Sequence, residues 1–371
     1  MLYLCTSVCL NTLSNIMPKN NKSIIIIAGP CSAENREQVL STAKAVKEAG
    51  AYMFRAGVWK PRTSPDSFAG IGHSALTWLK EAEKTYNIPV ATEVMSAEQT
   101  GACVDTGIRS LWIGARTTAN PFMVQQIADE LVKLNDKVKQ SLTIMVKNPV
   151  NPDIETWCGA IERIKNAGIN NVYAIHRGFS DSLGCNTSTI HETNIYRNNP
   201  IWSIPLNLQR RMPEVKLICD PSHITGDSSL VATVSQQALN LKYDGLMIEV
   251  HPTPSSALSD AKQQLTFEQF SHLVSSLSIP EISNIDNCLN TLRCRIDEID
   301  NTLWNMILER LKVAKQIGDI KHKTGMSIYQ QQRFEDMLTA RSKWAKEHNL
   351  PIDIVQRIVE CLHELAINEQ L

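Results

Sequence analysis

The chain has 371 residues, of which 43% are hydrophobic and 20% are charged, and its formal net charge is -1. This length exceeds what a single hydrophobic core usually holds, so two domains are expected. Near-neutral charge excludes a general attraction to nucleic acid or to an anionic membrane, so any affinity for anions must come from a focused local site.

The N-terminal segment and the cysteines bear on where the protein works. Residues 1–22 are expected to form an extension; MLYLCTSVCLNTLSNIM is apolar but lacks a basic start, so a weak signal peptide is the less favoured reading. No other stretch approaches the ~18 apolar residues that a membrane span needs. The ten cysteines are scattered and form no CxxC pair. This pattern is typical of reduced thiols in a cytoplasmic protein.

Short apolar runs alternate with amphipathic stretches from residue 23 to residue 277. The runs are continuous rather than alternating, as in parallel strands that are buried on both faces. This rhythm predicts an α/β domain, a (β/α)8 barrel, over 23–277. A doubly wound sheet is the alternative, but no GxGxxG follows the first strand. The expected strands are 23–29, 52–57, 89–94, 110–115, 142–147, 171–178, 216–220 and 244–250.

Polar residues stand at or just beyond the end of every expected strand. The carboxyl ends of barrel strands converge on one face, where active sites of this fold are built. Chance placement would scatter such residues, so their position favours one shared site. In chain order they are Cys31, Arg55, Glu93, Arg116, Lys147, Arg177, His223 and Glu249.

Four of the residues at this face could bind a metal: Cys31, His223, Glu249 and, in the loop after the last strand, Asp260. Thiolate, imidazole and carboxylate ligands suit Mn²⁺, Fe²⁺, Co²⁺ or Zn²⁺ better than Mg²⁺ or Ca²⁺. Mn²⁺ is the first expectation. Cys31 or His223 alone would more often be a packed core residue.

Five cations are expected at the same face: Arg55, Lys60, Arg116, Lys147 and Arg177. Such a group would repel itself unless an anion completed the site, and the guanidinium fork fits phosphate and carboxylate. The pattern predicts a substrate with several negative charges.

The segment 278–284 is polar, contains a proline and is expected to be a linker. Beyond it, 285–371 shows helical periodicity alone, with helices expected at about 285–321, 332–348 and from Pro351 to the end. Three helices, one of them roughly 50 Å long, make a poor core by themselves. An intertwined homodimer of this all-α domain is therefore expected.

Motifs in the first domain resemble those of 3-deoxy-D-arabino-heptulosonate 7-phosphate (DAHP) synthases, a family related to 3-deoxy-octulosonate 8-phosphate synthase. They are RAGVWKPRTSPDSFAGIG (55–72), IGAR (113–116), DPSH (220–223), and IEVHP with ALSDAKQQL within 248–265. The resemblance implies condensation of phosphoenolpyruvate with erythrose 4-phosphate, the first step of the shikimate pathway. It implies the four metal ligands above, and the five cations as the phosphoenolpyruvate site, with Lys60 and Lys147 in catalytic roles.

The sugar phosphate is the next implication of that resemblance. Arg62 and Thr63 are implied as its site. The octulosonate enzymes usually carry Asn-Arg after the lysine, whereas this chain has Pro61-Arg62 after Lys60. Erythrose 4-phosphate is therefore favoured over arabinose 5-phosphate.

The segment LRCRIDEIDNTLWNMILERLKVAKQIGDIK (292–321) resembles the first helix of the all-helical chorismate mutases. That resemblance implies rearrangement of chorismate to prephenate. Arg310 and Lys321 are about three full turns apart on one helix face, whereas Arg293 lies off that face and could serve a partner subunit. The implied substrate-binding residues are Arg293, Arg310, Lys321, Arg333 and Gln370, and Arg310, Lys321 and Gln370 are the implied catalytic ones.

Two positions depart from the mutase pattern. Phe334 stands where the family commonly has a glutamate that binds the substrate hydroxyl, and Ala366 stands where a serine is usual. A non-catalytic tail for regulation or dimerisation is therefore an alternative, as is an octulosonate-type synthase. Feedback on the barrel by chorismate or prephenate bound at the tail is also expected.

Overall fold

The computed structural model describes residues 24–61, 66–180, 196–279 and 287–371. The chain divides into two compact units, 1–280 and 281–371, and each is considered by itself. The expected extension (1–22) and most of the expected linker (278–284) lie outside the described residues, so their bounds stay predictions.

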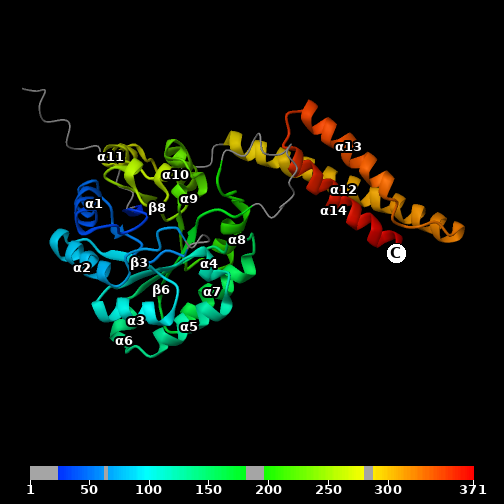
Figure 1. The fold of residues 1–371 in the computed structure, drawn as a ribbon. Helices are drawn as coiled ribbons and strands as arrows, with labels where there is room; N and C mark the ends of the chain where they lie inside the picture. The colour runs from blue at the N-terminus through cyan, green and yellow to red at the C-terminus, as the bar shows by residue number, and fades with distance from the viewer. Residues whose placement is uncertain (1–23, 62–65, 181–195, 280–286) are drawn as a thin grey trace, which may run out of the picture. The chain divides into compact units, whose positions relative to one another are not determined.

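The first unit is a closed barrel of parallel strands in chain order (Figure 1), which confirms the predicted (β/α)8 architecture. Strand β1 closes the barrel by pairing with β8, and this pairing places Gly29 opposite Glu249. Closure excludes the doubly wound alternative. The strands are β1 (Ile25–Gly29), β2 (Met53–Arg55), β3 (Val90–Val94), β4 (Ser110–Ile113), β5 (Thr143–Lys147), β6 (Asn171–His176), β7 (Lys216–Cys219) and β8 (Gly245–Glu249).

Side-chain caps define where several helices of this unit begin. Asn35 accepts the Gln38 amide at the start of α1, and Thr266 forms a reciprocal capping box with Gln269 at α11. The helices are α1 (Arg36–Glu48), α2 (Ser74–Tyr86), α3 (Ala97–Thr106), α4 (Ala115–Thr118), α5 (Pro121–Val132), α6 (Asp136–Ser141), α7 (Ile154–Asn166), α8 (Ser203–Arg211), α9 (Pro221–Thr225), α10 (Val231–Asn240) and α11 (Phe267–Ser276), with short turns η1 (Ser228–Leu230), η2 (Pro254–Ser256) and η3 (Ala261–Gln263).

The barrel has two separate apolar regions. The larger one packs the outward faces of the strands against the helices. The smaller one fills the barrel itself, so the interior is a packed core rather than a channel. Its members come from every strand and are Ile27, Met53, Ala91, Trp112, Met145, Tyr173, Ile175, Ile218 and Met247.

The second unit consists of α12 (Asn287–Thr324), α13 (Gln331–Glu347) and α14 (Ile352–Gln370). Arg310 contacts Leu362, and Gly318 lies against Gln370, so α14 runs parallel to the second half of α12. Small residues allow this approach: a Cβ on Gly318 would lie 2.9 Å from the Gln370 Cα. Pro351 directly precedes α14 rather than occupying its first turn.

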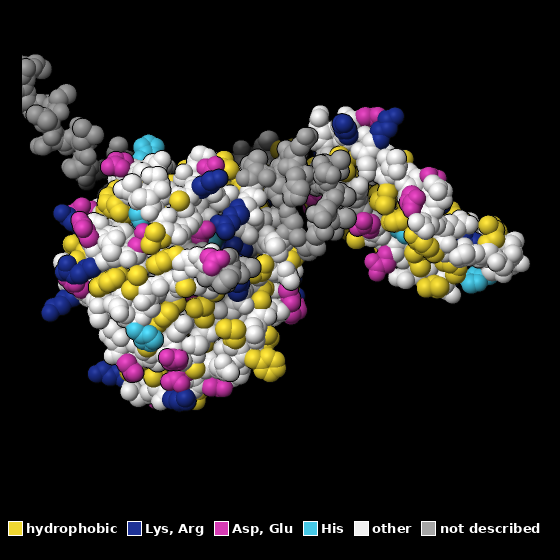
Figure 2. Space-filling model, viewed as in Figure 1, with side chains coloured by type: hydrophobic (Ala, Val, Ile, Leu, Met, Phe, Trp, Pro, Cys, Tyr) yellow, Lys and Arg dark blue, Asp and Glu magenta, His cyan; other side chains and the backbone are white. Residues whose placement is uncertain are grey.

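Apolar side chains remain exposed along the first half of α12. Leu292, Ile296, Ile299 and Leu303 recur at helical spacing and are each more than half exposed. Figure 2 shows hydrophobic side chains along the surface of this unit. An isolated copy of the unit therefore leaves a large apolar stripe in water.

None of the helices in the described ranges is long and apolar enough to cross a membrane. The cysteines described there are free thiols, at Cys31, Cys103, Cys158, Cys219, Cys294 and Cys361.

Candidate active sites

A layer of polar side chains lies directly above the packed interior of the barrel. Along a strand, every second side chain points to the same face. Arg55 follows the interior Met53 by two residues, Lys147 follows Met145, and Glu249 follows Met247, so all three project into the barrel mouth. By the same spacing the layer also contains Glu93, Arg177 and Asp220.

Glycine makes room in this layer. A Cβ on Gly114, which follows the interior Trp112, would lie 2.0 Å from the Glu93 carboxylate. The polar side chain of β3 thus occupies the space above β4. This explains why Arg116, the residue expected from that strand, instead lies on α4 with its guanidinium exposed and donating to the Pro61 carbonyl at 3.3 Å.

Three of the four proposed metal ligands converge. One ligand atom each of Cys31, Glu249 and Asp260 lies within 4.8 Å of the others, and the Cys31 Sγ donates to the Asp260 Oδ2 at 3.2 Å. Burial, and then the Glu249 carboxylate, raises the pKa of the Cys31 thiol to about 12. A divalent cation bound here would displace the thiol proton, and the thiolate and the two carboxylates would become its ligands.

The fourth proposed ligand, His223, lies beside this cluster. Its Nε2 is 3.8 Å from the Glu249 Oε1, and its Nδ1 is 2.9 Å from the Asp220 Oδ2. Because a carboxylate accepts, Nδ1 donates to Asp220, and Nε2 is the ring nitrogen on the side of Glu249. This carboxylate–histidine pair is the usual means of orienting a metal-binding imidazole.

Asp220 joins the histidine to the cation group. It is fully buried and also accepts from the Lys147 Nζ at 2.7 Å. Burial alone would raise the pKa of the Asp220 carboxyl, but His223 and Lys147 hold it well below its usual range. Sequence reasoning missed Asp220, although it is the first residue of DPSH and the one that the strand alternation places inside the barrel.

Arg55 is the most deeply buried of the cations. It donates to the Glu249 Oε1 at 2.9 Å and to the Cys31 carbonyl at 3.1 Å, and its guanidinium carbon lies 4.7 Å above the centre of the Trp112 ring. Its charge thus offsets that of a proposed metal ligand, and the aromatic ring beneath it contributes a cation–π contact.

The remaining cations also lie close to charged groups of the mouth. Burial lowers the pKa of Arg177 to about 10; Asp220 opposes that shift, and Arg197 and Arg116 add to it. The three guanidinium groups therefore lie within electrostatic reach of one another. Lys60 lies close to the proposed metal ligands, because its charge opposes the rise that burial causes in the pKa values of both Cys31 and Glu249.

Arg197 was not predicted. Its Nη1 donates to the Asp260 Oδ1 at 2.9 Å and to the Gln263 Oε1, also at 2.9 Å. Gln263 in turn donates to the Glu249 Oε2 at 2.7 Å. Arg197 lies 63 residues from Asp260 in the sequence, so only the tertiary fold brings the two together.

Side-chain bonds tie the Cys31 loop to the Asp260 loop. The Gln264 Oε1 accepts the Cys31 amide at 3.0 Å, and the Ser32 and Ser259 hydroxyls are 2.6 Å apart. Glu34 accepts the Leu258 amide at 2.8 Å. These links fix the two loops that carry proposed ligands. Arg62 and Thr63, the expected sugar phosphate site, lie outside the described residues.

A second polar group lies in the helical unit. The Lys321 Nζ donates to the Gln370 Oε1 at 3.0 Å and to the Ile328 carbonyl at 2.6 Å, and Arg310 donates to the Leu362 carbonyl at 2.7 Å. The predicted residues of α12 and α14 therefore share one face of the unit. Arg293 and Arg333 are exposed and do not join this group in the single chain.

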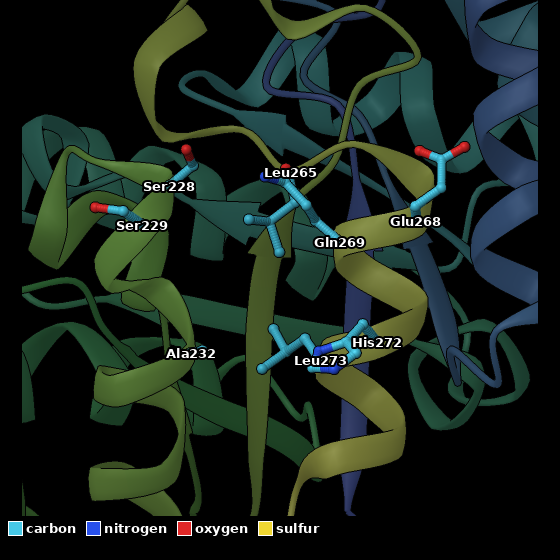
Figure 3. Close-up of a pocket in the computed structure, with 8 residues that line it drawn as sticks. All are labelled: Ser228, Ser229, Ala232, Leu265, Glu268, Gln269, His272 and Leu273. Carbon is cyan, nitrogen blue, oxygen red and sulfur yellow. The ribbon is translucent and has the colours of Figure 1, made fainter.

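A hollow of about 410 Å³ in the barrel unit lies elsewhere. Figure 3 shows Ser228, Ser229 and Ala232 on one side of it and residues of α11, including His272, on the other. None of the predicted site residues lines it, so we do not assign the chemistry to it.

Comparisons with known proteins match two parts of the chain to known families. Residues 8–279 match the DAHP synthetase I family, and residues 292–371 match chorismate mutase type II. A phospho-2-dehydro-3-deoxyheptonate aldolase from Thermotoga maritima is 32% identical over 257 residues, which are 69% of this chain and 70% of that protein. A 2-dehydro-3-deoxyphosphooctonate aldolase from Desulfotalea psychrophila is 25% identical and is matched over 71% of this chain and 92% of its own length.

Two solved structures of a DAHP synthase are also similar to this chain. A crystal structure of the Thermotoga maritima phospho-2-dehydro-3-deoxyheptonate aldolase (DAHP synthase) matches with a TM-score of 0.58 and 30% identity, over 69% of this chain and 68% of that chain. A truncated form of the synthase from the same organism matches with a TM-score of 0.56 and 28% identity, over 69% of this chain and 85% of that one.

Proposed function

Because the chain belongs to the DAHP synthetase I family and also carries a chorismate mutase type II domain, we propose that one polypeptide catalyses both reactions. The barrel would join phosphoenolpyruvate, erythrose 4-phosphate and water to give DAHP and phosphate, and the helical unit would rearrange chorismate to prephenate. The observation that carries the first part is the pairing of a thiol–carboxylate cluster with a group of cations at one barrel mouth.

We assign a divalent metal to Cys31, His223, Glu249 and Asp260. The donor set fits such an ion, because the thiol and two carboxylates already lie within 4.8 Å and His223 directs Nε2 toward Glu249. A metal bound there would act as a Lewis acid on the aldehyde oxygen of the sugar phosphate. Mn²⁺ is our first choice, with Fe²⁺, Co²⁺ and Zn²⁺ as alternatives.

The cations bind and orient the two anionic substrates. Buried Arg55 and Lys147 each have one carboxylate partner, whereas Arg177 has Asp220 within electrostatic reach but is also repelled by Arg197 and Arg116. An added phosphate or carboxylate would relieve that repulsion. We assign Arg55, Lys60, Arg116, Lys147 and Arg177 to phosphoenolpyruvate, and Arg62 and Thr63 to erythrose 4-phosphate.

Lys147 and Lys60 are the residues that we assign to charge and proton handling. As C3 of phosphoenolpyruvate attacks the aldehyde carbon, negative charge develops on the aldehyde oxygen; water then adds at C2 and phosphate leaves. Lys147 is held by Asp220 and keeps further ammonium donors for the substrate. Donors positioned before the reaction stabilise developing charge without reorganising.

The mutase reaction requires positioning rather than a nucleophile. Arg310 and Lys321 suit the two carboxylates and the ether oxygen of chorismate, and Gln370 is held beside Lys321. The Lys321 ammonium has three N–H donors. Two of them bond to the Ile328 carbonyl and the Gln370 Oε1, which leaves one for a ligand. Donors that meet the charge developing on the ether oxygen would lower the barrier.

We propose that two copies associate through the exposed stripe of α12. Coverage by a second copy would bury Leu292, Ile296 and Ile299, which the single chain leaves in water. It could also supply Arg293 to the partner's site. Substituting Ile299 by Glu should yield monomers in sedimentation experiments, whereas Lys315→Glu, at an already polar exposed position of α12, should not.

The test of the proposed function is a pair of assays on the full chain. The first follows consumption of phosphoenolpyruvate with erythrose 4-phosphate or with arabinose 5-phosphate, before and after chelation and after return of Mn²⁺. The second follows loss of chorismate. We expect metal-dependent turnover that strongly favours erythrose 4-phosphate, and metal-independent loss of chorismate. Equal turnover of the two sugars would favour an octulosonate-type enzyme, and stable chorismate would favour a regulatory tail.

A further inference from the structure

His363 on α14 is a polar residue to which the proposed mutase reaction assigns no role. It lies one helical turn before Ala366 and two turns before Gln370, so it shares their face of α14. Its Nε2 is buried and has no hydrogen-bond partner among the described residues. A buried nitrogen without a partner is costly, and it calls for an explanation.

The surroundings of His363 belong to the same site. Its ring stacks on Phe334, with ring centres 4.3 Å apart and planes 20° apart, and the Tyr329 ring centre is 6.1 Å away. The neighbouring Leu362 carbonyl accepts from Arg310. Burial lowers the pKa of His363, and the nearby Arg310 and Lys321 lower it further. A neutral imidazole thus stands beside the two cations assigned to chorismate.

Chorismate has one polar group that these cations are not suited to bind. Chorismate carries two carboxylates and an ether oxygen, which suit cations, and a secondary hydroxyl, which both donates and accepts. Neither Phe334 nor Ala366 can bond with that hydroxyl. A neutral imidazole offers one N–H donor and one acceptor nitrogen, so it matches a hydroxyl in either tautomer.

We propose that His363 binds the ring hydroxyl of chorismate, with Phe334 as the platform that holds the imidazole. The proposal rests on the mutase function proposed above. It makes Phe334 part of the site: a flat aromatic surface fixes the ring plane, and the imidazole provides the polar atom that residue 334 itself does not. The histidine would then be a specificity-determining residue, since its bond distinguishes the hydroxylated ring from a deoxygenated one.

The test compares two ligands and four proteins. The ligands are bicyclic dicarboxylate analogues of the transition state, one with the ring hydroxyl and one without it. The proteins are the full wild-type chain, His363→Phe, His363→Asn and Cys361→Ala. The phenyl ring preserves stacking on Phe334 and removes both nitrogens, the amide preserves a donor and an acceptor, and Cys361 is an exposed residue on the opposite face of α14.

We expect the wild type and Cys361→Ala to bind the hydroxylated analogue about tenfold more tightly, a typical effect of one hydrogen bond. His363→Phe should bind the two analogues equally and lose about tenfold in kcat/KM for chorismate, while His363→Asn keeps part of the preference. An undiminished preference in His363→Phe, with an unchanged melting temperature, would overturn the proposal. Wild-type protein that neither binds an analogue nor consumes chorismate would instead refute the mutase function itself.

Discussion

Buried charges at the barrel mouth occur in pairs of opposite sign. Arg55 meets Glu249 at 2.9 Å, and Lys147 meets Asp220 at 2.7 Å. Removal of one partner of such a pair leaves an uncompensated charge in the interior, which is far more costly than loss of a surface ion pair. Each of these residues is therefore constrained both by stability and by its proposed role, so loss of activity in its variants must be accompanied by a measurement of folding.

Cys31 allows the two effects to be separated, because its thiol is uncharged without a metal. We expect Cys31→Ala to weaken Mn²⁺ binding by at least ~10²-fold, because loss of a residue that only supports a ligand already costs about 10- to 100-fold. In titration calorimetry and thermal melting, Mn²⁺ should stabilise the wild type but not the variant. Cys103→Ala, which removes another buried thiol, on α3 in the outer apolar region, serves as the matched control. Equal Mn²⁺ affinity of Cys31→Ala and the control would contradict the metal assignment.

A second prediction at this scale concerns His176. Its ring lies among Phe179, Trp202 and Tyr243, and the Tyr243 hydroxyl is 3.0 Å from its Nδ1. Burial lowers the pKa of His176 from 6.5 to about 3. Between these pH values the unfolded chain binds a proton that the folded chain does not. This contribution to stability is therefore present above pH 6.5 and is lost as pH falls, by about 1.4 kcal/mol per pH unit.

The measurement is the free energy of unfolding of the barrel in urea between pH 4 and about 7. His176→Phe removes the titrating group while keeping an aromatic ring in an aromatic cluster, so its stability should fall less steeply as the pH is lowered. The lost Tyr243 hydrogen bond shifts the curve by a constant and does not change its slope. Parallel curves for the two proteins would show that the His176 proton is not linked to folding.

At the scale of elements, the strands were the most predictable part of the fold. Runs such as 110–115 and 142–147 are continuous and apolar because parallel strands are covered on both faces, and each coincides with an observed strand. The convergence of Cys31, Glu249 and Asp260 followed from barrel closure. The roles of Asp220 and Arg197 did not, because they depend on which side chains face inward and on tertiary contacts between distant segments.

Helix α14 shows the same limit in the second unit. Gln370 could be matched to a family pattern, but His363 looks in the sequence like an ordinary polar residue on an amphipathic helix. Its significance depends on Phe334, which lies on another helix 29 positions away, and on a parallel packing of α14 on α12 that periodicity does not specify.

The end of α14 yields a prediction for this element. Gln370 is tied to α12 by its side chain, which accepts from Lys321, and by its carbonyl oxygen, which lies 2.8 Å from the His322 Nε2. Helix ends fray, so these contacts hold the terminal turn in place. Deletion of residues 370–371 should reduce mutase kcat by on the order of 10²-fold, as loss of one positioned donor does in other enzymes. Deletion of the exposed Leu371 alone should have little effect, and equal rates for the two truncated chains would exclude Gln370 from the site.

At the scale of the whole molecule, the question is why a synthase and a mutase share one chain. The mutase acts on a later product of the sequence that the synthase begins. A later product that binds the helical unit can therefore change the activity of the synthase, provided that its affinity differs between two states of the protein. We predict that prephenate, or chorismate, inhibits the synthase reaction by binding at the helical unit.

The barrel ends with a natural point for truncation, because Ser278 exchanges two hydrogen bonds with Gln236 on α10 and the first compact unit ends at Pro280. The full chain, a chain truncated after Pro280 and the full chain with Arg310→Ala should be assayed with and without prephenate. Inhibition should appear only in the full chain without the Arg310→Ala substitution. The expected coupling free energy is about 1–3 kcal/mol, or roughly 5- to 150-fold in affinity. Because coupling between binding sites is reciprocal, phosphoenolpyruvate must weaken prephenate binding to the full chain by the same factor. Equal inhibition of the truncated chain would place the effector on the barrel, and the helical unit would then have no part in regulating it.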